Sequence, residues 1–232
     1  MTKRKEKIKH GHNFVYPQLK ASAINYEFPL GGQIQILDTA KKLGVSITPV
    51  REALQRLAAE GLIESKETRG FFGRVLAADI VAAQYEFGLL VLTEALKATS
   101  ASEIFHLEIS AAGLSSLGGS SWNRKAYPDS RAQQLEEVYV QIGKVSGKRL
   151  LLEAVKQFVS HTHYIRRISM ESEAYADMQM VAVLEIKAFL DGGKIWSAQE
   201  VLHEQFEKKL KALPALVKEG IARSYGRAAA KT

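Results

Sequence analysis

One stretch, GVSITPVREALQRLAAEGLIESKETRGF at residues 44–71, constrains the fold of this 232-residue chain more than any other. Gly44 is typical of a helix end, Thr48-Pro49 of a helix start with Thr48 as N-cap, and Gly61 of the next helix end. The apolar residues between them fall on one stripe at helical spacing: Val50, Ala53, Leu54 and Leu57. Two β-prone runs, LIES and FFGRV, flank KETRG and predict a hairpin with a basic tip.

The residues before this stretch predict two further helices. Apolar residues recur at helical spacing from Phe14 to Phe28, and PLGG at 29–32 then breaks the pattern. A short helix is expected over Asp38–Leu43, with Asp38 as its N-cap. Two short helices joined by LGVS and followed by a hairpin make a winged helix-turn-helix, which we place at residues 14–76.

The positive charge of the chain is concentrated in its first third. Residues 1–75 hold 13 lysines and arginines against 7 acidic residues, whereas residues 76–232 hold 19 against 18. Such asymmetry indicates a polyanionic partner for the first part, and nucleic acid is the commonest one. Residues 1–13 are predicted to form a basic flexible arm, which either trails along the duplex or serves only solubility.

The second helix of such a pair suits double-stranded DNA. Its N-terminal residues reach base edges and phosphates in the major groove, and its free N–H groups favour a phosphate. Glycine at the hairpin tip lets the backbone approach the duplex closely. The candidate DNA-binding residues are Ser46, Ile47, Thr48, Pro49, Arg51, Gln55, Arg69 and Gly70.

Beyond Leu76 the sequence is helical in texture. Helices are expected at 79–99, 102–114, 130–145, 149–169, 173–191, 195–212 and 214–226, with an irregular segment at 115–130. The predicted fold is therefore mainly α, an N-terminal winged helix-turn-helix followed by an all-α helical bundle at 77–232. We expect this bundle to bind a ligand or to dimerise the chain.

The motif LGVSITPVREALQRLAAEGLIESKETRGFFGRV closely resembles the winged helix of the GntR superfamily of bacterial transcription regulators. The family pattern is roughly LGVSRTPVREALxRLxxEGLVxxxxxRGxxV, and YEFPLGGQI at 26–34 resembles its usual entry segment. Two positions depart from it, because the family usually has arginine where this chain has Ile47, and many members have one where it has Leu37. Isoleucine cannot form a bidentate contact with guanine, although it can pack against a thymine methyl group.

The helical remainder resembles the FadR-like effector and dimerisation domain (FCD-type) of that superfamily, through KVSGKRLL at 144–151 and FLDGGKIWSAQEVL at 189–202. Many members bind a divalent metal there through one Asp and three His. In this chain the corresponding positions hold Leu135, Tyr139, Val183 and Gln205, with His203 two positions from the last. Leucine and valine cannot ligate a metal, so no metal and no cofactor is expected. Candidate effector-binding residues are Tyr139, His163, Arg166 and His203.

The resemblance implies a transcription regulator that binds an operator as a homodimer, with a small organic acid as possible effector. An alternative is a DNA-binding regulator whose helical domain only dimerises or contacts a partner. An enzyme is not expected, because the chain has no Gly-rich phosphate loop, G-x-S-x-G, HExxH or cysteine nucleophile. No apolar run approaches the length that spans a bilayer, so no membrane partner and a cytoplasmic location are predicted.

Overall fold

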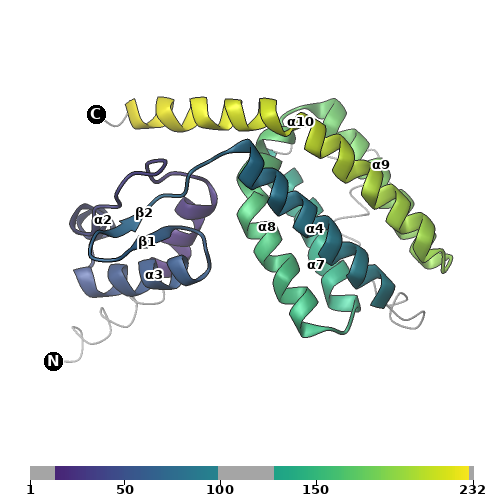
Figure 1. Ribbon diagram of the computed structural model, residues 1–232, viewed down its shortest axis with the longest axis horizontal. Helices are drawn as coiled ribbons and strands as arrows, with labels where there is room; N and C mark the ends of the chain where they lie inside the picture. Colours follow the sequence, from purple (N-terminus) through teal and green to yellow (C-terminus); the bar gives the residue numbers. More distant parts are fainter. Residues whose placement is uncertain (1–13, 99–127, 230–232) are drawn as a thin grey trace. The chain divides into compact units, whose positions relative to one another are not determined.

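The computed structural model describes residues 14–98 and 128–229, and it divides into two units (Figure 1). One unit extends to Leu76 and also takes in the end of the chain from Gly220; the other runs from Ala77 to Glu219. The predicted fold class is confirmed, with a winged helix-turn-helix in the first unit and helices in the described part of the second. The basic arm at 1–13, the expected helix at 102–114 and most of the irregular segment lie outside the described residues.

The N-terminal unit joins three helices to a two-stranded sheet. A helix over residues 14–24 precedes α2 (Ile36–Leu43) and α3 (Ile47–Ala59). Strands β1 (Glu64–Lys66) and β2 (Gly70–Phe72) then pair antiparallel, with Ser65 opposite Phe71. Bridges from Leu30 to Gly73 and from Gln33 to Phe72 add the segment before α2 to this sheet. The buried core joins all three helices to the sheet: Val15, Leu19, Ala23, Ile34, Ala40, Val50, Ala53, Leu54, Leu57, Leu62, Ile63 and Phe71.

Two predicted helix starts are wrong by a few residues. The N-cap of α2 is Gln35, so Asp38 lies inside the first turn, where its negative charge faces the positive end of the helix dipole. The N-cap of α3 is Ser46, and Thr48 is the second helical residue. Pro49 fits the third position because the first four N–H groups of a helix have no partner within it. Gly44 ends α2 with φ 65°, as its position in the sequence predicts.

The entry segment passes close to the end of β2, and glycine makes this possible. A Cβ atom on Gly73 would lie 2.3 Å from the carbonyl oxygen of Pro29, a distance that no side chain tolerates. Gly73 N–H also donates to Gly32 O over 2.9 Å, and Gly31 N–H donates to Gly73 O over 3.1 Å. These contacts fix the wing to the segment that leads into α2.

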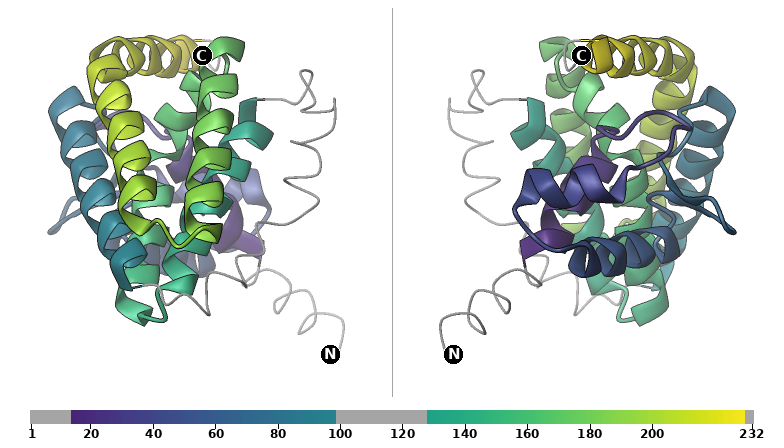
Figure 2. Two further views of the ribbon diagram at one scale, coloured as in Figure 1. Left: turned by 90° about the vertical axis from the view of Figure 1, so that its right-hand side faces the viewer. Right: turned by 90° about the vertical axis from the view of Figure 1, so that its left-hand side faces the viewer.

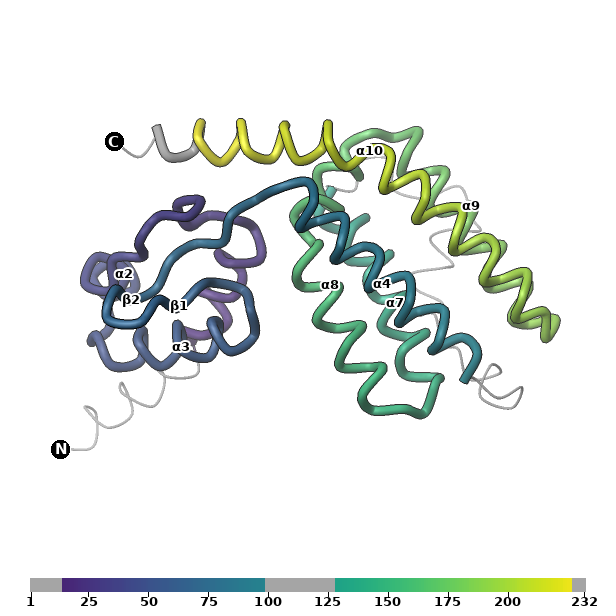
Figure 3. The backbone as a smooth tube through the Cα atoms, in the orientation of Figure 1, coloured from purple at the N-terminus to yellow at the C-terminus, as the bar shows by residue number. Residues whose placement is uncertain are grey.

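The second unit is built from α4 (Ala78–Ala98), α7 (Pro128–Val145), α8 (Arg149–Ser169), α9 (Glu173–Asp191) and the first part of α10 (Ile195–Ala229). Helices α4, α7 and α8 pack against one another, and α9 contacts α7. The views of Figures 2 and 3 show α9 and the start of α10 side by side and antiparallel. No helix of the described ranges is long and apolar enough to cross a membrane.

Four aromatic rings form the centre of this unit. Tyr85, Tyr139, Phe158 and Phe206 are all buried, with ring centroids 5.6–6.0 Å apart for the pairs in contact. Gly88 makes room for them, because a Cβ atom there would lie 2.4 Å from the Phe158 ring. Edge-on and tilted ring pairs of this kind are favourable beyond the apolar area that they bury.

The prediction of two helices at 195–212 and 214–226 is wrong, because α10 continues through Pro214. Proline removes one backbone hydrogen bond and crowds the preceding turn, which interrupts a helix only if packing does not compensate. Here Leu213 and Val217 are buried on either side of it, 1% and 3% exposed. Packing of these flanking residues keeps the backbone helical.

Candidate nucleic-acid interface and buried polar cluster

The N-terminal end of α3 is open to solvent. Ser46, Ile47 and Thr48 are all exposed, and Ser46 makes no side-chain capping bond in spite of its extended backbone. The first turn of α3 contains no acidic residue. Its N–H groups and the positive end of its dipole are therefore available to an anion.

Two polar side chains continue this face along α3. Ile47, Arg51 and Gln55 are four residues apart in turn, so they lie on the same side of the helix, and all three are exposed. Arg51 forms no ion pair with any residue that the structure describes. Arg56, by contrast, donates to Glu60 over 3.1 Å and lies 3.7 Å from the ring centre of Tyr16. Arg51 is the arginine of α3 that remains free for a phosphate or a base.

The tip of the wing carries the next arginine. Thr68 and Gly70 both have positive φ, 60° and 92°, and Arg69 N–H closes the turn on Lys66 O over 3.0 Å. Gln33 Nε2 donates to the carbonyl oxygen of Arg69 over 2.8 Å. The backbone of Arg69 is thus held while its side chain is exposed.

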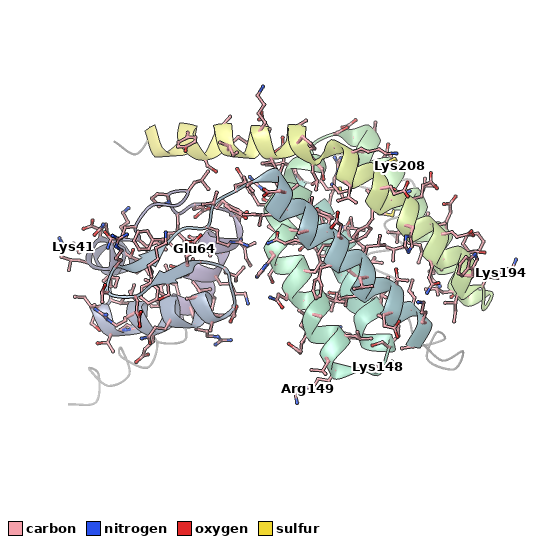
Figure 4. All side chains as sticks on the ribbon, in the orientation of Figure 1. Lys41, Glu64, Lys148, Arg149, Lys194 and Lys208 are labelled. Atoms are coloured by element: carbon pink, nitrogen blue, oxygen red, sulfur yellow. The ribbon has the colours of Figure 1, made fainter. Side chains whose placement is uncertain are left out.

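Pro49 differs from the other predicted DNA-binding residues. Its ring is buried with the core residues of α3, so it shapes the helix start and presents no side chain outward. Leu37 and Ile47, the two positions where arginine is usual in the family that the sequence resembles, are 54% and 42% exposed. Lys41 at the end of α2 also extends into solvent (Figure 4).

A network at the other end of α3 holds this helix in place. Glu60 accepts hydrogen bonds from the hydroxyl of Tyr16, over 2.5 Å, and from Lys20 Nζ, over 2.7 Å. Burial raises the pKa of Glu60, but these bonds and the charge of Lys20 outweigh it, so the pKa is lowered. The first helix of the unit therefore anchors α3 through an ionised carboxylate.

The helical unit contains a buried polar cluster, made of Tyr85, Glu136, Tyr139, Thr162, His163, Arg166, Ser169, Tyr175 and Lys209. Glu136 binds two of its members, His163 Nδ1 at 2.8 Å and Arg166 at 2.5 Å. Arg166 also donates to Thr162 Oγ1 over 2.5 Å. Burial raises the pKa of Glu136, but the charge of Arg166 and the bonds from both partners lower it overall. Glu136 is therefore an ionised partner for a guanidinium only 1% exposed.

Lys209 of α10 lies in the same interior, 4% exposed. Its ammonium nitrogen is 2.6 Å from Ser169 Oγ and 4.2 Å from the ring centre of Tyr175. Burial lowers the pKa of Lys209 well below its ordinary value, and the charge of Arg166 lowers it further. The hydroxyl oxygens of Tyr85 and Tyr175 are buried without a hydrogen bond of normal geometry.

The structure brings three of the four predicted effector residues together and separates the fourth. Tyr139 lies under Arg166, 5.5 Å from ring centre to guanidinium carbon, and His163 joins them through Glu136. His203 is exposed and reaches Thr93 Oγ1 of α4 at 3.4 Å. His203 lies on the side of α10 away from the buried stripe of α10, so it contacts the surface of α4.

Glu136 and Lys209 were missed by the sequence reasoning. The sequence does contain a signal for Lys209. It lies at helical spacing within the row of apolar residues that α10 buries: Leu202, Phe206, Leu213 and Val217. A lysine at such a position is either paired or has a shifted pKa. Glu136 carried no comparable signal, because acidic residues next to one another at 136 and 137 are typical of a solvated helix face.

The two histidines of the sequence HTH point to different partners. His161 lies 3.5 Å from Gln84 of α4, whereas His163 faces Glu136 of α7. This divergence follows from a separation of two residues on a helix. Among the described residues, no group of three or more His, Cys, Asp or Glu is arranged to hold a metal ion.

Comparison with known proteins identifies the N-terminal unit. Residues 12–72 match the sequence profile of the bacterial regulatory proteins, gntR family. The chain is 44% identical over 64 residues to the Nta operon transcriptional regulator of Aminobacter aminovorans, covering 28% of this chain and 30% of that protein. It is 49% identical over 49 residues to the probable D-xylose utilization operon transcriptional repressor of Paenarthrobacter nicotinovorans, covering 21% of this chain and 22% of that protein. The matched segments thus span less than a third of these relatives.

Solved structures extend the likeness in fold to the helical unit. A putative transcriptional regulator GntR from Rhodococcus sp. RHA1 matches with a TM-score of 0.66 at 16% identity, covering 88% of this chain and 97% of that one. McbR/YncC of E. coli matches with a TM-score of 0.59 at 18% identity, also covering 88% of this chain and 97% of that one. The winged helix-turn-helix segment therefore matches the gntR family, and the fold of the described residues, a winged helix-turn-helix followed by a helical unit, is similar to these solved structures.

Proposed function

We propose that this chain is a sequence-specific DNA-binding transcription regulator that binds its operator as a homodimer in the cytoplasm. The observation that carries the proposal is the open N-terminal end of α3 together with two exposed arginines outside any ion pair of the described residues, Arg51 and Arg69. The proposed DNA-facing residues are Ser46, Ile47, Thr48, Arg51, Gln55, Arg69 and Gly70. Pro49 is not among them, because its ring is buried and shapes the start of α3.

In this proposal α3 enters the major groove and the wing reaches an adjacent backbone or groove. Thr48, Arg51 and Gln55 supply hydrogen bonds to phosphates and base edges, whereas Ile47 supplies an apolar contact such as a thymine methyl group. An operator read in this way holds an A·T pair where arginine-bearing relatives read guanine. The restrained backbone of Arg69 reduces the entropy lost when its side chain binds.

The helical unit is assigned the role of effector and dimerisation domain, of the FadR-like type. The buried polar cluster supports an acidic effector, because it contains two basic groups: Arg166, which pairs with Glu136, and Lys209, which donates to the Ser169 hydroxyl. An effector bound there shifts the population of conformers that differ in operator affinity. This favours the effector-binding alternative over a helical unit that serves only for dimerisation.

The operator part is tested by fluorescence anisotropy with labelled duplexes, using DNA from upstream of the chain's own operon and a random duplex of equal length. We expect the upstream DNA to bind at least ~10³-fold more tightly at physiological salt. Arg51→Ala and Arg69→Ala should each weaken binding, and Lys194→Ala, at an exposed lysine of the helical unit, is the matched control (Figure 4). Equal affinity for both duplexes would overturn the proposal.

A further inference from the structure

The first helix of the N-terminal unit, residues 14–24, contacts α3 through a polar network outside the apolar core. The network consists of Tyr16, Lys20, Arg56 and Glu60. Oxygen Oε1 of Glu60 accepts from the Tyr16 hydroxyl over 2.5 Å and from Arg56 Nε over 3.1 Å. Oxygen Oε2 accepts from Lys20 Nζ over 2.7 Å. Both carboxylate oxygens are therefore engaged, and they fix the orientation of the Glu60 side chain.

The two network residues of the first helix also contact each other. Tyr16 and Lys20 are four positions apart, so they lie on the same side of that helix. Lys20 Nζ donates to the Tyr16 hydroxyl over 3.0 Å, and the Arg56 guanidinium lies 3.7 Å from the centre of the Tyr16 ring. The side chains of Lys20 and Glu60 are 32% and 29% exposed, so solvent and salt screen this pair less than a fully exposed one. The four residues thus form one connected cluster.

The network lies on the side of α3 away from the proposed DNA contacts. At about 100° per residue, Arg56 and Glu60 are about 140° and 180° around the helix from Arg51. The buried stripe that includes Val50 and Leu54 occupies the flank between these two sides. Helix α3 is therefore held along two lines, one apolar and one polar, and neither line coincides with the side that faces DNA.

The apolar stripe alone leaves the roll of α3 about its own axis loosely defined. Burial of apolar area is non-directional, whereas a hydrogen bond requires a narrow range of distances and angles. The outer atoms of a helix lie about 5–6 Å from its axis, so a roll of about 10° moves them by about 1 Å. A shift of this size breaks a hydrogen bond to a base edge but hardly changes the attraction between an arginine and the phosphates.

We propose that Tyr16 and Glu60 are positioning residues for operator recognition, which set the roll of α3 and so its ability to distinguish the operator from other DNA. This inference rests on the proposed operator binding and adds which residues, outside the DNA-facing set, determine specificity. Loss of the network lowers affinity for the operator, where base contacts matter. It leaves affinity for random DNA, which depends on phosphate contacts, nearly unchanged.

The test uses Tyr16→Phe in the full chain, which removes the hydroxyl bond to Glu60 and keeps the ring beside Arg56. Anisotropy measures affinity for the upstream duplex and for the random duplex at one salt concentration, well below the unfolding midpoint. We expect a loss of about three- to tenfold for the upstream duplex and of less than about twofold for the random one. Partial unfolding would lower both affinities by the same factor, so the ratio of the two affinities reports the position of α3 and not its stability.

Ser22→Ala is the matched control, because it removes another hydroxyl of the first helix, one that donates to Glu27 over 2.8 Å outside the network. Its affinity ratio should equal that of the wild type. Glu60→Gln is the second variant, and it should lower the ratio further because Lys20 and Arg56 lose their shared anion. If Glu60→Gln does not fold, Tyr16→Phe, which removes a single oxygen atom, decides the question. Where the wild type distinguishes the two duplexes, an unchanged ratio in Tyr16→Phe would overturn the inference.

Residual dipolar couplings of backbone amides in the free chain test the same inference without DNA. We expect Tyr16→Phe to change the couplings of α3 relative to those of the first helix, and Ser22→Ala to leave them unchanged. Unchanged couplings in Tyr16→Phe would also overturn the inference. Specific DNA binding with the ratio and couplings of the wild type in Tyr16→Phe would remove the positioning role and leave the regulator role intact. Changed couplings in a chain whose wild type does not distinguish the two duplexes would do the reverse.

Discussion

The side-chain amide of Gln33 donates a hydrogen bond of 2.8 Å to the backbone carbonyl of Arg69, and so ties the tip of the wing to the segment before α2. The two residues are 36 positions apart in the chain. The bridge between Gln33 and Phe72 holds the same two segments together one step further along β2. The side chain of Arg69 therefore extends from a backbone that is held in place, even though the residue lies in an exposed turn.

Replacing Gln33 with alanine should loosen the wing without unfolding the unit. We expect operator affinity to fall about three- to tenfold, because the freed turn loses more conformational entropy when it binds DNA. The free energy of unfolding should fall by about 1 kcal/mol or less, since the lost bond is solvent-exposed. Anisotropy and urea titration measure the two quantities, and Gln157→Ala on the exposed face of α8 is the control. A large loss of stability with unchanged affinity would show that Gln33 acts only in folding.

Ile47→Arg should restore a phosphate or base contact at the start of α3. Because Ile47 is 42% exposed at an open helix end, the longer side chain fits without disturbing the core. We expect tighter binding to duplexes with guanine at the contacted position, by about three- to tenfold, and a salt slope steeper by about one. Binding is measured between 50 and 300 mM salt.

The control for this substitution is Leu150→Arg, which adds the same charge at a residue 84% exposed in the helical unit. It should leave the salt slope unchanged. If Ile47→Arg also leaves the slope unchanged, position 47 does not face DNA in the complex.

Much of the fold was predictable because the local signals in the sequence agree with the final packing. Gly44 and Gly61 adopt the positive φ that their positions suggest, and the apolar stripe of α3 forms the core. The structure differs from the sequence prediction where packing outweighs a local preference. Asp38 and Thr48 are good N-caps, but the two helices begin earlier, with Gln35 and Ser46 as their N-caps. Pro214 is a helix breaker that packing of its neighbours overrides.

The candidate sites were predictable to different degrees. The DNA-facing residues lie close together in the sequence, so a local motif identifies most of them. The buried polar cluster joins Tyr85, Glu136, Arg166 and Lys209, which come from four helices and lie up to 124 positions apart. Only tertiary packing decides which of many helical glutamates meets a buried arginine.

Glu136→Gln should destabilise the helical unit strongly. The change leaves Arg166 buried without its counter-charge, and removal of one partner of a buried pair costs about 3–5 kcal/mol. The lowered pKa of Glu136 means that its contribution is complete above about pH 4.3 and is lost as the pH falls through its folded-state pKa. The difference between wild type and variant should therefore shrink under acid conditions. Urea unfolding between pH 3 and 7 measures it.

The neighbouring Glu137 provides the control, because it is 50% exposed and pairs loosely with Lys144 at 3.6 Å. Glu137→Gln should change the free energy of unfolding by no more than about 0.5 kcal/mol. Equal effects of the two substitutions at pH 7 would contradict the assignment of Glu136 as the counter-ion of Arg166.

We expect the homodimer to form through an exposed apolar side of α4. Ile80, Phe87 and Leu90 lie on one side of this helix and are 46%, 46% and 68% exposed in the single chain. Covering such a face in a second copy removes apolar area from water, which drives association. We expect Leu90→Glu to convert a dimer to a monomer in light scattering coupled to gel filtration and to weaken operator binding as a result. Leu150→Glu, at a leucine 84% exposed on α8, should leave the dimer intact, and a dimer that survives Leu90→Glu would place the interface elsewhere.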